Sequence, residues 1–376
     1  MKSTPGHPSY ETPTSEELRS RAGARVCEPS SDNPSRRTFL AELAALGAGA
    51  LLTKSASTSQ AAASEPVAVY RIDVHCHFAP PSWVAELAPK GIMWPPLAKW
   101  TPAKHVEDMD QAGVAASIVS ITTPGLWFGD TAVARGLARE CNDYAARLAQ
   151  DYPHRFRMFV ALPFPDVDGS LREIEYGLDT LHADGIGLFT SYGDKWLGDP
   201  AFAPVFEELN RRSALVYTHP AAATCCHNLV PGIGDVVIEY GTDTSRAIAR
   251  MVFGGSARRY PDIRLIFSHA GGTMPFLIER FDNLAKTPPY STELQGGFRA
   301  EARKFYYDTA QSSNPAAMAA LKTVIPISHI VFGTDYPFRT HVDHVKGLRD
   351  CGVFTDQELR GIERENVLPL LPRYQA

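Results

Sequence analysis

The hexapeptide IDVHCH at positions 72–77 contains two histidines that are two residues apart. On a β-strand, side chains at positions i and i+2 point to the same face, so His75 and His77 should converge. Two converging imidazoles are a ready pair of ligands for a metal ion. The spacing alone is weak support for a metal site, because two exposed loop histidines would have the same pattern.

Three further apolar runs end in an ionisable residue. His219 follows LVYT, His269 follows RLIFS, and Asp335 follows IVFGT. If each run is a core strand, these residues lie where the strand leaves the core, which is where barrel enzymes build their active sites. A buried, hydrogen-bonded histidine would explain any one of them. Four strand ends that all carry histidine or aspartate indicate a shared site.

Short β-branched segments alternate with longer amphipathic segments from residue 70 onward. The eight segments predicted as strands are Tyr70–His75, Ala116–Ser120, Arg157–Ala161, Gly185–Thr190, Leu215–His219, Arg264–His269, Phe305–Thr309 and His329–Thr334. The segments predicted as helices are Ala103–Ala112, Thr131–Gln150, Ser170–Ala183, Ala203–Arg212, Thr244–Phe253, Met274–Asn283 and Pro315–Thr323. This rhythm is typical of an α/β protein, a (β/α)8 or TIM barrel. A doubly wound open sheet is the alternative, but its first strand is normally followed by a glycine-rich turn.

Three of the predicted connections are long, at residues 78–101, 220–241 and 287–304. The first two leave the carboxyl ends of strands, so we expect these βα loops to cover a pocket at the carboxyl-terminal mouth of the barrel. Residues 64–376 are predicted to form this barrel as one domain.

The composition is that of an ordinary globular protein. The 376-residue chain has 44% hydrophobic residues and a formal net charge of −5, so it has no basic excess for binding nucleic acid. No membrane span is expected, because the longest weakly polar stretch, residues 43–53, is shorter than the roughly 20 apolar residues that a spanning helix needs. Six cysteines without a C-x-x-C pair predict neither a disulfide scaffold nor a structural zinc site.

Residues 1–63 are predicted to be a leader that precedes the barrel. Residues 1–35 are rich in Ser, Pro, Thr and Glu, which predicts disorder. The segment Ser35-Arg36-Arg37-Thr38-Phe39-Leu40, a mild apolar run and the ending Ala61-Ala62-Ala63 together resemble a twin-arginine signal peptide. The resemblance implies a periplasmic or secreted protein that is cleaved near Ala63. An alanine-rich arm on a cytoplasmic protein is the alternative.

Longer strings of residues carry a second resemblance. The strings are Glu173-Ile174-Glu175-Tyr176, Ala183-Asp184-Gly185, Leu188-Phe189-Thr190, Ser268-His269-Ala270-Gly271-Gly272-Thr273 and Asp308-Thr309-Ala310. With the histidines and aspartate at the strand ends, they resemble the amidohydrolase superfamily. The group that they resemble is amidohydrolase-2, which includes the aminocarboxymuconate-semialdehyde and 6-methylsalicylate decarboxylases. The resemblance covers the whole chain after the leader.

The resemblance implies a role for each strand-end residue. It implies that one divalent metal ion, Zn²⁺ or alternatively Mn²⁺, is held by four ligands, His75, His77, His219 and Asp335. His269 would lie beside the metal as an acid/base and electrostatic group. Asp335 would also be the proton donor in catalysis, with His269 as its main competitor.

Two residues are expected to bind the substrate. Arg280 matches an arginine that related decarboxylases use on a substrate carboxylate, sometimes from a neighbouring subunit. A salt bridge on a helix surface is the alternative for this residue. Phe189 is expected near the mouth, where it could sandwich an aromatic ring together with Tyr192, Trp196 and Trp127. Ordinary packing in a loop or in the core is the alternative for each of these aromatic residues.

The expected reaction is non-oxidative decarboxylation of a hydroxylated aromatic acid that resembles 6-methylsalicylate. Related enzymes with a dicarboxylate substrate carry an additional arginine before a Trp-Asp-Pro step, but the matching stretch here, residues 95–102, has no arginine. This departure favours a less charged aromatic acid. The alternatives are a metal-dependent hydrolase of a cyclic ester or amide, and a degenerate barrel that only binds its ligand. The resemblance also implies a homodimer.

Overall fold

The computed structural model describes residues 70–374. The predicted leader, residues 1–63, lies outside the described residues, and so does the predicted start of the barrel domain at residue 64. The fold below is therefore that of the part of the chain that follows the leader.

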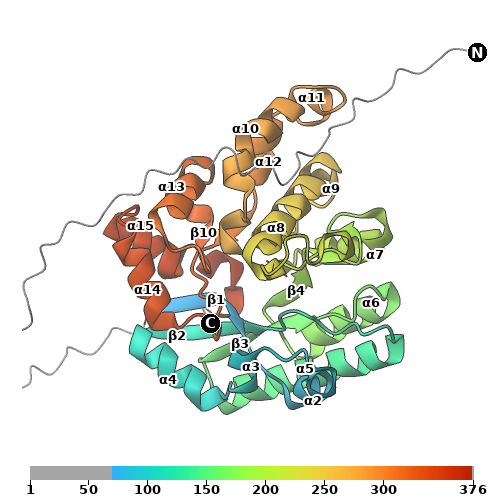
Figure 1. The fold of residues 1–376 in the computed structure, drawn as a ribbon, viewed down its shortest axis with the longest axis vertical. Coiled ribbons are helices and arrows are strands. Elements are labelled where there is room, and N and C mark those ends of the chain that lie inside the picture. Colours follow the sequence, from blue (N-terminus) through green and yellow to red (C-terminus); the bar gives the residue numbers. More distant parts are fainter. Residues whose placement is uncertain (1–69, 375–376) are drawn as a thin grey trace, which may run out of the picture. The chain divides into compact units, whose positions relative to one another are not determined.

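Eight parallel strands form the centre of the fold (Figure 1). Their order in the sheet follows the sequence: β1 (Arg71–His77), β2 (Val114–Ser120), β3 (Phe156–Ala161), β4 (Gly185–Phe189), β7 (Leu215–His219), β8 (Arg264–Phe267), β9 (Tyr306–Asp308) and β10 (Ile330–Val331). Val74 N donates to Phe332 O at 3.0 Å, and His77 N donates to Tyr336 O at 2.7 Å. These bonds join β1 to the segment after β10. The predicted (β/α)8 barrel is confirmed, and the open sheet is not.

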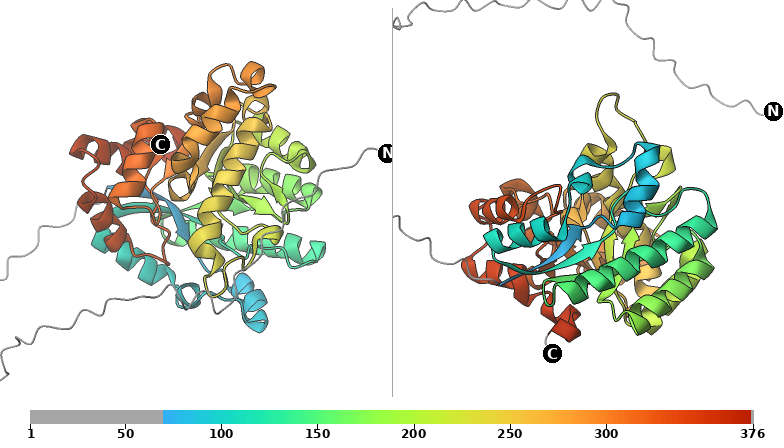
Figure 2. Two further views of the ribbon diagram at one scale, coloured as in Figure 1. Left: turned by 45° about the horizontal axis from the view of Figure 1, so that its top comes forward. Right: turned by 90° about the horizontal axis from the view of Figure 1, so that it is seen from below.

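Helices surround the strands, as the two views in Figure 2 show. Their bounds are α2 Pro81–Leu87, α3 Pro95–Ala98, α4 Pro102–Ala112, α5 Thr131–Asp151, α6 Val167–Glu175, α7 Ala203–Arg211, α8 Asp235–Phe253, α9 Ser256–Arg259, α10 Met274–Ala285, α11 Tyr290–Glu293, α12 Gly297–Ala302, α13 Pro315–Val324, α14 His341–Asp350 and α15 Asp356–Arg360. A short hairpin of β5 (Ser191–Tyr192) and β6 (Lys195–Trp196) follows β4. Within residues 70–374, no helix is long and apolar enough to cross a membrane.

Helix α8 begins earlier than the sequence pattern predicts, at Asp235 and not at Thr244. In its first turns Val236, Val237 and Ile238 are exposed, whereas Glu239 is buried. A prediction from hydrophobic periodicity assumes that apolar residues face the core. This part of α8 reverses that pattern, so the helical period was visible only in its second half.

The apolar core has two parts. One fills the inside of the barrel and includes Val74, Phe159 and Tyr217, with the last two rings stacked at a centroid distance of 5.1 Å. The other lies between the strands and the helices and includes Trp83 and Phe298, which are fully buried. This arrangement fixes the strand ends that carry the ionisable residues.

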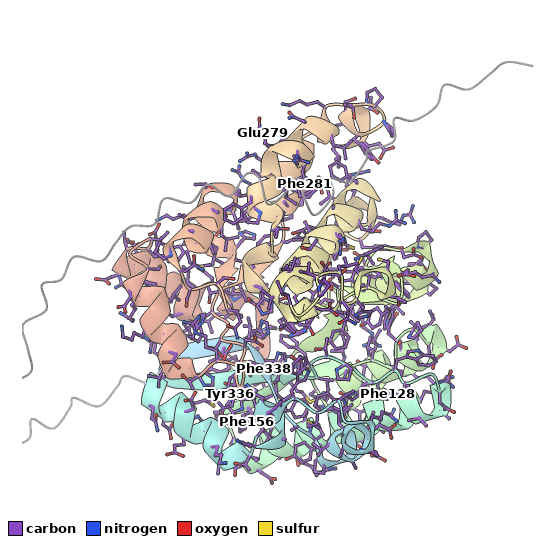
Figure 3. All side chains as sticks on the ribbon, viewed as in Figure 1. Phe128, Phe156, Glu279, Phe281, Tyr336 and Phe338 are labelled. Carbon is purple, nitrogen blue, oxygen red and sulfur yellow. The ribbon has the colours of Figure 1, made fainter. Side chains whose placement is uncertain are left out.

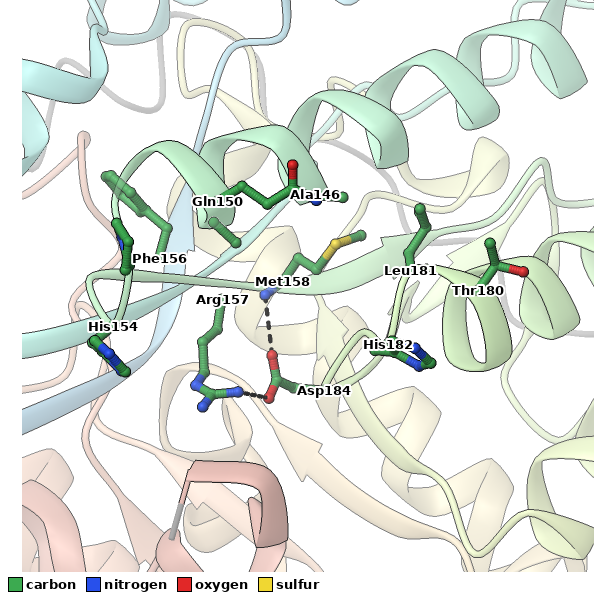
Figure 4. Close-up of a pocket in the computed structure, with 12 residues that line it drawn as sticks. Ala146, Gln150, His154, Phe156, Arg157, Met158, Thr180, Leu181, His182 and Asp184 are labelled. Carbon is green, nitrogen blue, oxygen red and sulfur yellow. Dashed lines mark hydrogen bonds and ion pairs between the residues drawn. The ribbon is translucent and has the colours of Figure 1, made fainter. Parts of the chain in front are cut away.

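A pocket of about 410 Å³ lies at the amino-terminal ends of β3 and β4 (Figure 4). Arg157 pairs there with Asp184 at 2.7 Å, and Asp184 also accepts a hydrogen bond from Met158 N. Because the strand-end histidines lie at the opposite, carboxyl-terminal end, this pocket is separate from the candidate site. Its charged groups already neutralise each other.

A buried charge cluster joins β1, α4 and α14. His341 Nε2 lies 3.1 Å from Asp73 Oδ2, and His341 Nδ1 lies 2.6 Å from Asp108 Oδ2. A histidine donates from both ring nitrogens only as an imidazolium. Burial alone would lower the pKa of His341, but the hydrogen bonds with Asp108 and Asp73 raise it. Asp73 also accepts a hydrogen bond from His75 N, at 2.9 Å, so the cluster supports the strand that carries the histidines.

We expect His341→Gln to lower the free energy of unfolding by roughly 3–5 kcal/mol at about pH 6, because two carboxylates lose their shared cation. The pKa of His341 is raised in the folded chain, so its contribution is complete below the unfolded pKa of about 6.5. That contribution is lost as the pH rises through the raised pKa. Urea unfolding over a pH series measures both effects, and the difference from wild type should shrink at high pH.

The matched control is His154→Gln at an exposed histidine. Equal stability of His341→Gln and wild type at the lower pH would contradict a structural role for the imidazolium.

Candidate metal centre and active-site cavity

A bulge in β1 turns its two histidines toward the mouth of the barrel. Asp73 pairs with Ser117 of β2, but Cys76 pairs with Val119, so β1 has one extra residue between these pairs. A β-bulge of this kind re-aims the side chains that follow it. Val74 therefore packs inside the barrel and Cys76 packs outside it. His75 and His77 then face the same side, as the i, i+2 spacing predicts.

Two more strand ends complete a group of four potential metal ligands. One donor atom from each residue lies within 4.8 Å of the others, and all four residues are buried: His75, His77, His219 and Asp335. Asp335 has a left-handed backbone, with φ of 73°. Such a conformation is costly for a residue other than glycine and is found most often at functional sites. Here the turn directs the carboxylate back toward β1.

The contacts inside this group fit a divalent cation. Asp335 Oδ1 lies 3.2 Å from His75 Nε2 and 3.0 Å from His77 Nε2. His75 Nε2 is buried and, among the described residues, makes no hydrogen bond in spite of that distance. A buried polar nitrogen without a partner is costly, and three imidazoles with one carboxylate are a donor set suited to Zn²⁺ or Mn²⁺. The four residues therefore could hold one divalent ion.

The outer nitrogen of each imidazole is held by an oxygen atom, so the Nε2 atoms face the centre. The Nδ1 contacts are Asp308 Oδ2 for His75 at 2.7 Å, the Ser120 carbonyl for His77 at 3.2 Å, and the Pro220 carbonyl for His219 at 2.8 Å. Partners of this kind fix the tautomer and the orientation of a metal-binding histidine.

Burial and mutual contacts shift the pKa values of three of the four groups, His77, His219 and Asp335, toward the forms that bind a metal ion. Burial lowers the pKa of His77, and burial with the neighbouring imidazoles holds the pKa of His219 well below its usual value. Burial would raise the pKa of Asp335, but contacts with His269, His75 and His77 hold it well below its ordinary range. Neutral imidazoles and an ionised carboxylate are the forms that bind a metal ion.

Asp308 links the metal-ligand group to the next strand end. It accepts from His75 Nδ1, from His269 N at 2.8 Å and from Ala310 N at 3.0 Å. Burial would lower the pKa of His75, but the charge of Asp308 raises it to about 10. Binding of a cation at His75 Nε2 would therefore release a proton.

His269 lies beside the group of four. Its Nε2 is 3.6 Å from Asp335 Oδ2 and has no hydrogen-bond partner within residues 70–374. Its ring centroid lies 4.8 Å from that of His75. The structure thus brings together all five strand-end residues that the sequence singled out, with His269 facing the second carboxylate oxygen of Asp335.

A cavity of about 490 Å³ opens above these residues. His219, His269 and Asp335 lie at its floor, and its aromatic walls come from Trp94, Tyr240 and Phe338. Its other lining residues are Thr122, Thr123, Val236, Gly241, Gly272, Thr273, Gln311 and Ser312. No lysine or arginine of the described part of the chain lines this cavity.

Comparison with known proteins decides the family. The Amidohydrolase family model (Amidohydro_2) matches residues 72–372, most of the chain. The chain belongs to the Amidohydrolase family. Decarboxylase yanB of Aspergillus niger is 35% identical over 325 residues, which cover 81% of this chain and 88% of that protein. The 6-methylsalicylic acid decarboxylase of Penicillium expansum is 34% identical over 318 residues, covering 81% and 97%.

Comparison with solved structures finds the same fold in a decarboxylase. A dihydroxybenzoic acid decarboxylase from a Polaromonas species, solved with bound manganese and the inhibitor 2-nitroresorcinol, matches with a TM-score of 0.71 and 21% identity over 82% of this chain and 98% of that one. These findings confirm the resemblance to amidohydrolase-2 decarboxylases that the strings of residues indicated.

In this amidohydrolase chain, Phe189 lies beside the metal-ligand group but does not line the cavity of about 490 Å³. Its ring centroid is 6.0 Å from that of His219. Tyr192 stacks on Phe164, and Trp196 donates its Nε1 hydrogen to Asp243 at 2.6 Å. The substrate-binding role expected for Phe189 stays a prediction, and the ring of a substrate in this cavity would face other aromatic residues.

Arg280 lies on α10 with an exposed side chain and does not line the cavity of its own chain. The structure does not bring it to the four metal ligands. A role at the site of a neighbouring subunit stays a prediction.

Three aromatic residues that line the cavity were not predicted from the sequence. Phe338 packs edge-on against His77 at a centroid distance of 5.9 Å and against Trp94 at 6.0 Å; it lies near the centre of the view in Figure 3. Tyr240 approaches His219 from α8, at 6.1 Å. The position of Phe338, three residues after Asp335, was the available signal. Trp94 and Tyr240 lie in the segments 78–101 and 220–241, which the sequence pattern predicts only as long connections, although Tyr240 is on α8.

We expect Asp308→Asn to weaken metal binding by about 10- to 100-fold, the usual cost of losing a partner that orients a metal-binding histidine. The amide cannot supply the negative charge that the His75 Nδ1–H faces. Competition with a chelator of known affinity measures the change.

The control is Asp151→Asn, at an exposed residue far from β9. Unchanged metal affinity in folded Asp308→Asn would show that His75 is oriented without Asp308.

Proposed function

We propose that this protein is a metal-dependent, non-oxidative decarboxylase of a hydroxylated aromatic monocarboxylic acid that resembles 6-methylsalicylate. The observation that carries the proposal is the cavity, which is lined by potential metal ligands and three aromatic residues and by no lysine or arginine of residues 70–374. Two relatives that are named decarboxylases support the same reaction, and the match covers 88% and 97% of their length.

We further propose Zn²⁺ as the resident ion, with Mn²⁺ as the alternative. A donor set of three histidines and one carboxylate suits both ions, and the manganese in the Polaromonas structure supports the second. When bound, the ion supplies a charge that holds the carboxylate and the ortho-hydroxyl of the substrate and stabilises negative charge on the ring.

The residues of the chain supply position and protons. Trp94, Phe338 and Tyr240 line the cavity and offer aromatic surface to a flat ring, and the rings of Trp94 and Phe338 pack edge to face at a centroid distance of 6.0 Å. Asp335 Oδ2 and His269 Nε2 lie 3.6 Å apart and both residues line the cavity; in the proposed complex the ring carbon that bears the carboxylate lies beside them. In the reaction that carbon accepts a proton, the bond to the carboxylate breaks, and CO₂ leaves with no change of oxidation state.

Asp335 is the proposed proton donor, with His269 as the competing group. Because the pKa of Asp335 is held well below its ordinary range, its carboxylate is ionised at rest. It must therefore first accept a proton, and the phenolic hydroxyl of the substrate is a suitable source. Proton transfer to carbon then requires the acid to be within hydrogen-bond reach of the ring.

The direct test is incubation of the metal-loaded protein with a panel of ortho-hydroxybenzoic acids and lactones, followed by mass spectrometry. We expect a phenol and CO₂ from a 6-methylsalicylate-like acid, and complete loss of this activity in Asp335→Asn or after chelation, with recovery when Zn²⁺ or Mn²⁺ is returned. Metal analysis of the purified protein identifies the ion.

Two results would overturn the proposal. Acid release without CO₂ from a cyclic ester or amide would identify the protein as a hydrolase. Inactivity on the whole panel at full metal occupancy would exclude decarboxylation of this class of acid.

We also propose that residues 1–63 direct export, on the basis of the twin-arginine pattern at Arg36 and Arg37. Changing both to lysine should keep the protein in the cytoplasm of a bacterium with a twin-arginine pathway, as measured by cell fractionation. The same exchange at Arg19 and Arg21 is the control. Cytoplasmic retention of the wild-type chain would contradict export.

A homodimer, in which Arg280 of one copy reaches the cavity of the other, is proposed from the family resemblance. The exposed position of Arg280 on α10 is compatible with contact to a second copy.

A further inference from the structure

Gln311 occupies an unusual backbone position at the edge of the cavity. It lies three residues after β9, and Ser312 N donates to Thr309 O at 3.1 Å to close a turn. Gln311 itself has φ of 51°, in the left-handed region. That conformation is costly for a residue with a long side chain. The turn places the amide of Gln311 among the residues that line the cavity.

The Gln311 amide contacts one oxygen of the Asp335 carboxylate. Gln311 Nε2 donates to Asp335 Oδ2 at 3.0 Å. The other oxygen, Oδ1, faces His75 and His77. The carboxylate is therefore held in one orientation, with Oδ1 among the metal ligands and Oδ2 toward the cavity and His269. Because a carboxylate only accepts hydrogen bonds when ionised, the nitrogen and not the oxygen of the amide must face it.

The rest of the amide is free to contact a ligand. A glutamine amide has two N–H donors and a carbonyl acceptor, and the side chain uses one donor on Asp335. Gln311 is exposed in the absence of a ligand, and its second N–H and its carbonyl have no hydrogen bond within residues 70–374. A group bound beside Asp335 would meet them.

The other neutral donors of the cavity are mostly engaged. Thr123 and Tyr240 share a hydrogen bond of 2.7 Å, and Thr273 shares one of 2.9 Å with Ser245. Within residues 70–374 no lysine or arginine lines the cavity, so the described part of the chain offers an anionic substrate no cationic side chain there. Gln311 is the amide that borders both the Asp335 carboxylate and the open volume.

We propose that Gln311 is a substrate-binding and positioning residue for ortho-hydroxy aromatic monoacids. One N–H fixes the Asp335 carboxylate, and the remaining amide groups receive the carboxylate or hydroxyl of the substrate. The inference rests on the proposed decarboxylase function. A neutral amide provides hydrogen bonds without a charge, which suits a monoanion whose charge the metal ion already balances.

The test compares Gln311→Met with wild type, both loaded with metal. Methionine has nearly the same length but no amide. The matched control is Gln357→Met, at an exposed glutamine of α15. The readouts are metal content, melting temperature, kcat, KM and the affinity for 3-methyl-2-nitrophenol, a nitro analogue of 6-methylsalicylate that cannot lose CO₂.

We expect Gln311→Met to keep its metal and melting temperature but to lose roughly 10- to 100-fold in kcat/KM, the usual effect of losing a hydrogen bond to a charged group. A fall in kcat reports the loss of Asp335 positioning, and a rise in KM with about 10-fold weaker binding of the nitro analogue reports the loss of the substrate contact. Gln311→Glu should lose more, because its carboxylate repels Asp335 and adds negative charge to the cavity.

Unchanged kcat, KM and nitrophenol affinity in Gln311→Met would overturn the inference and leave the proposed function intact. Loss of metal and stability with normal kinetics in the remaining loaded fraction would assign Gln311 a purely structural role and would also overturn it. A wild-type protein that binds the nitrophenol through Gln311 but decarboxylates nothing would remove the proposed function and keep the binding role. No binding by wild type would remove both.

Discussion

The buried carboxylate of Asp335 is the constraint on which the rest of the site depends. A buried anion is costly unless it is paired and hydrogen-bonded. Asp335 is surrounded by His75, His77 and His269 and by the amide of Gln311. Its backbone is part of the same arrangement, because Asp335 N donates to His75 O at 2.7 Å. That bond is one of several that join β1 to the segment after β10, so the turn that carries Asp335 contributes both to closure of the barrel and to assembly of the metal ligands.

Much of this could be predicted from the sequence, because the rules involved are local. The i, i+2 spacing placed His75 and His77 on one face, and the end of an apolar run placed His219 at the mouth. The predicted barrel strands are correct in number and order, but four of them, β4, β8, β9 and β10, were predicted to extend too far at their carboxyl ends. His269 and Asp335 have left-handed backbones, and such residues leave the hydrogen-bonded ladder. Hydrophobic runs do not reveal where a chain leaves a sheet to aim a side chain.

The cavity walls could not be predicted in the same way. Trp94 after β1, Tyr240 on α8 and Phe338 after β10 are far apart in the sequence and meet only because the barrel closes. Trp196 was closer in sequence to a strand end, but its indole N–H is used by the buried carboxylate of Asp243. An aromatic residue near a strand end can equally anchor a loop, and only the tertiary contact distinguishes the two roles.

The ligand group by itself does not choose between hydrolysis and decarboxylation, since the same fold and ligands serve both. The exposure of the cavity-lining acid groups to water helps to distinguish the two reactions. Hydrolysis needs a water molecule at the reacting atom, whereas protonation of a ring carbon needs an acid close to the carbon and water kept away. The side chains of Asp335 and His269 are only 10% and 13% exposed, although both border the cavity. A flat ring bound in this cavity beside Asp335 and His269 would reduce that exposure further. The geometry therefore favours delivery of a proton to the ring over attack by water.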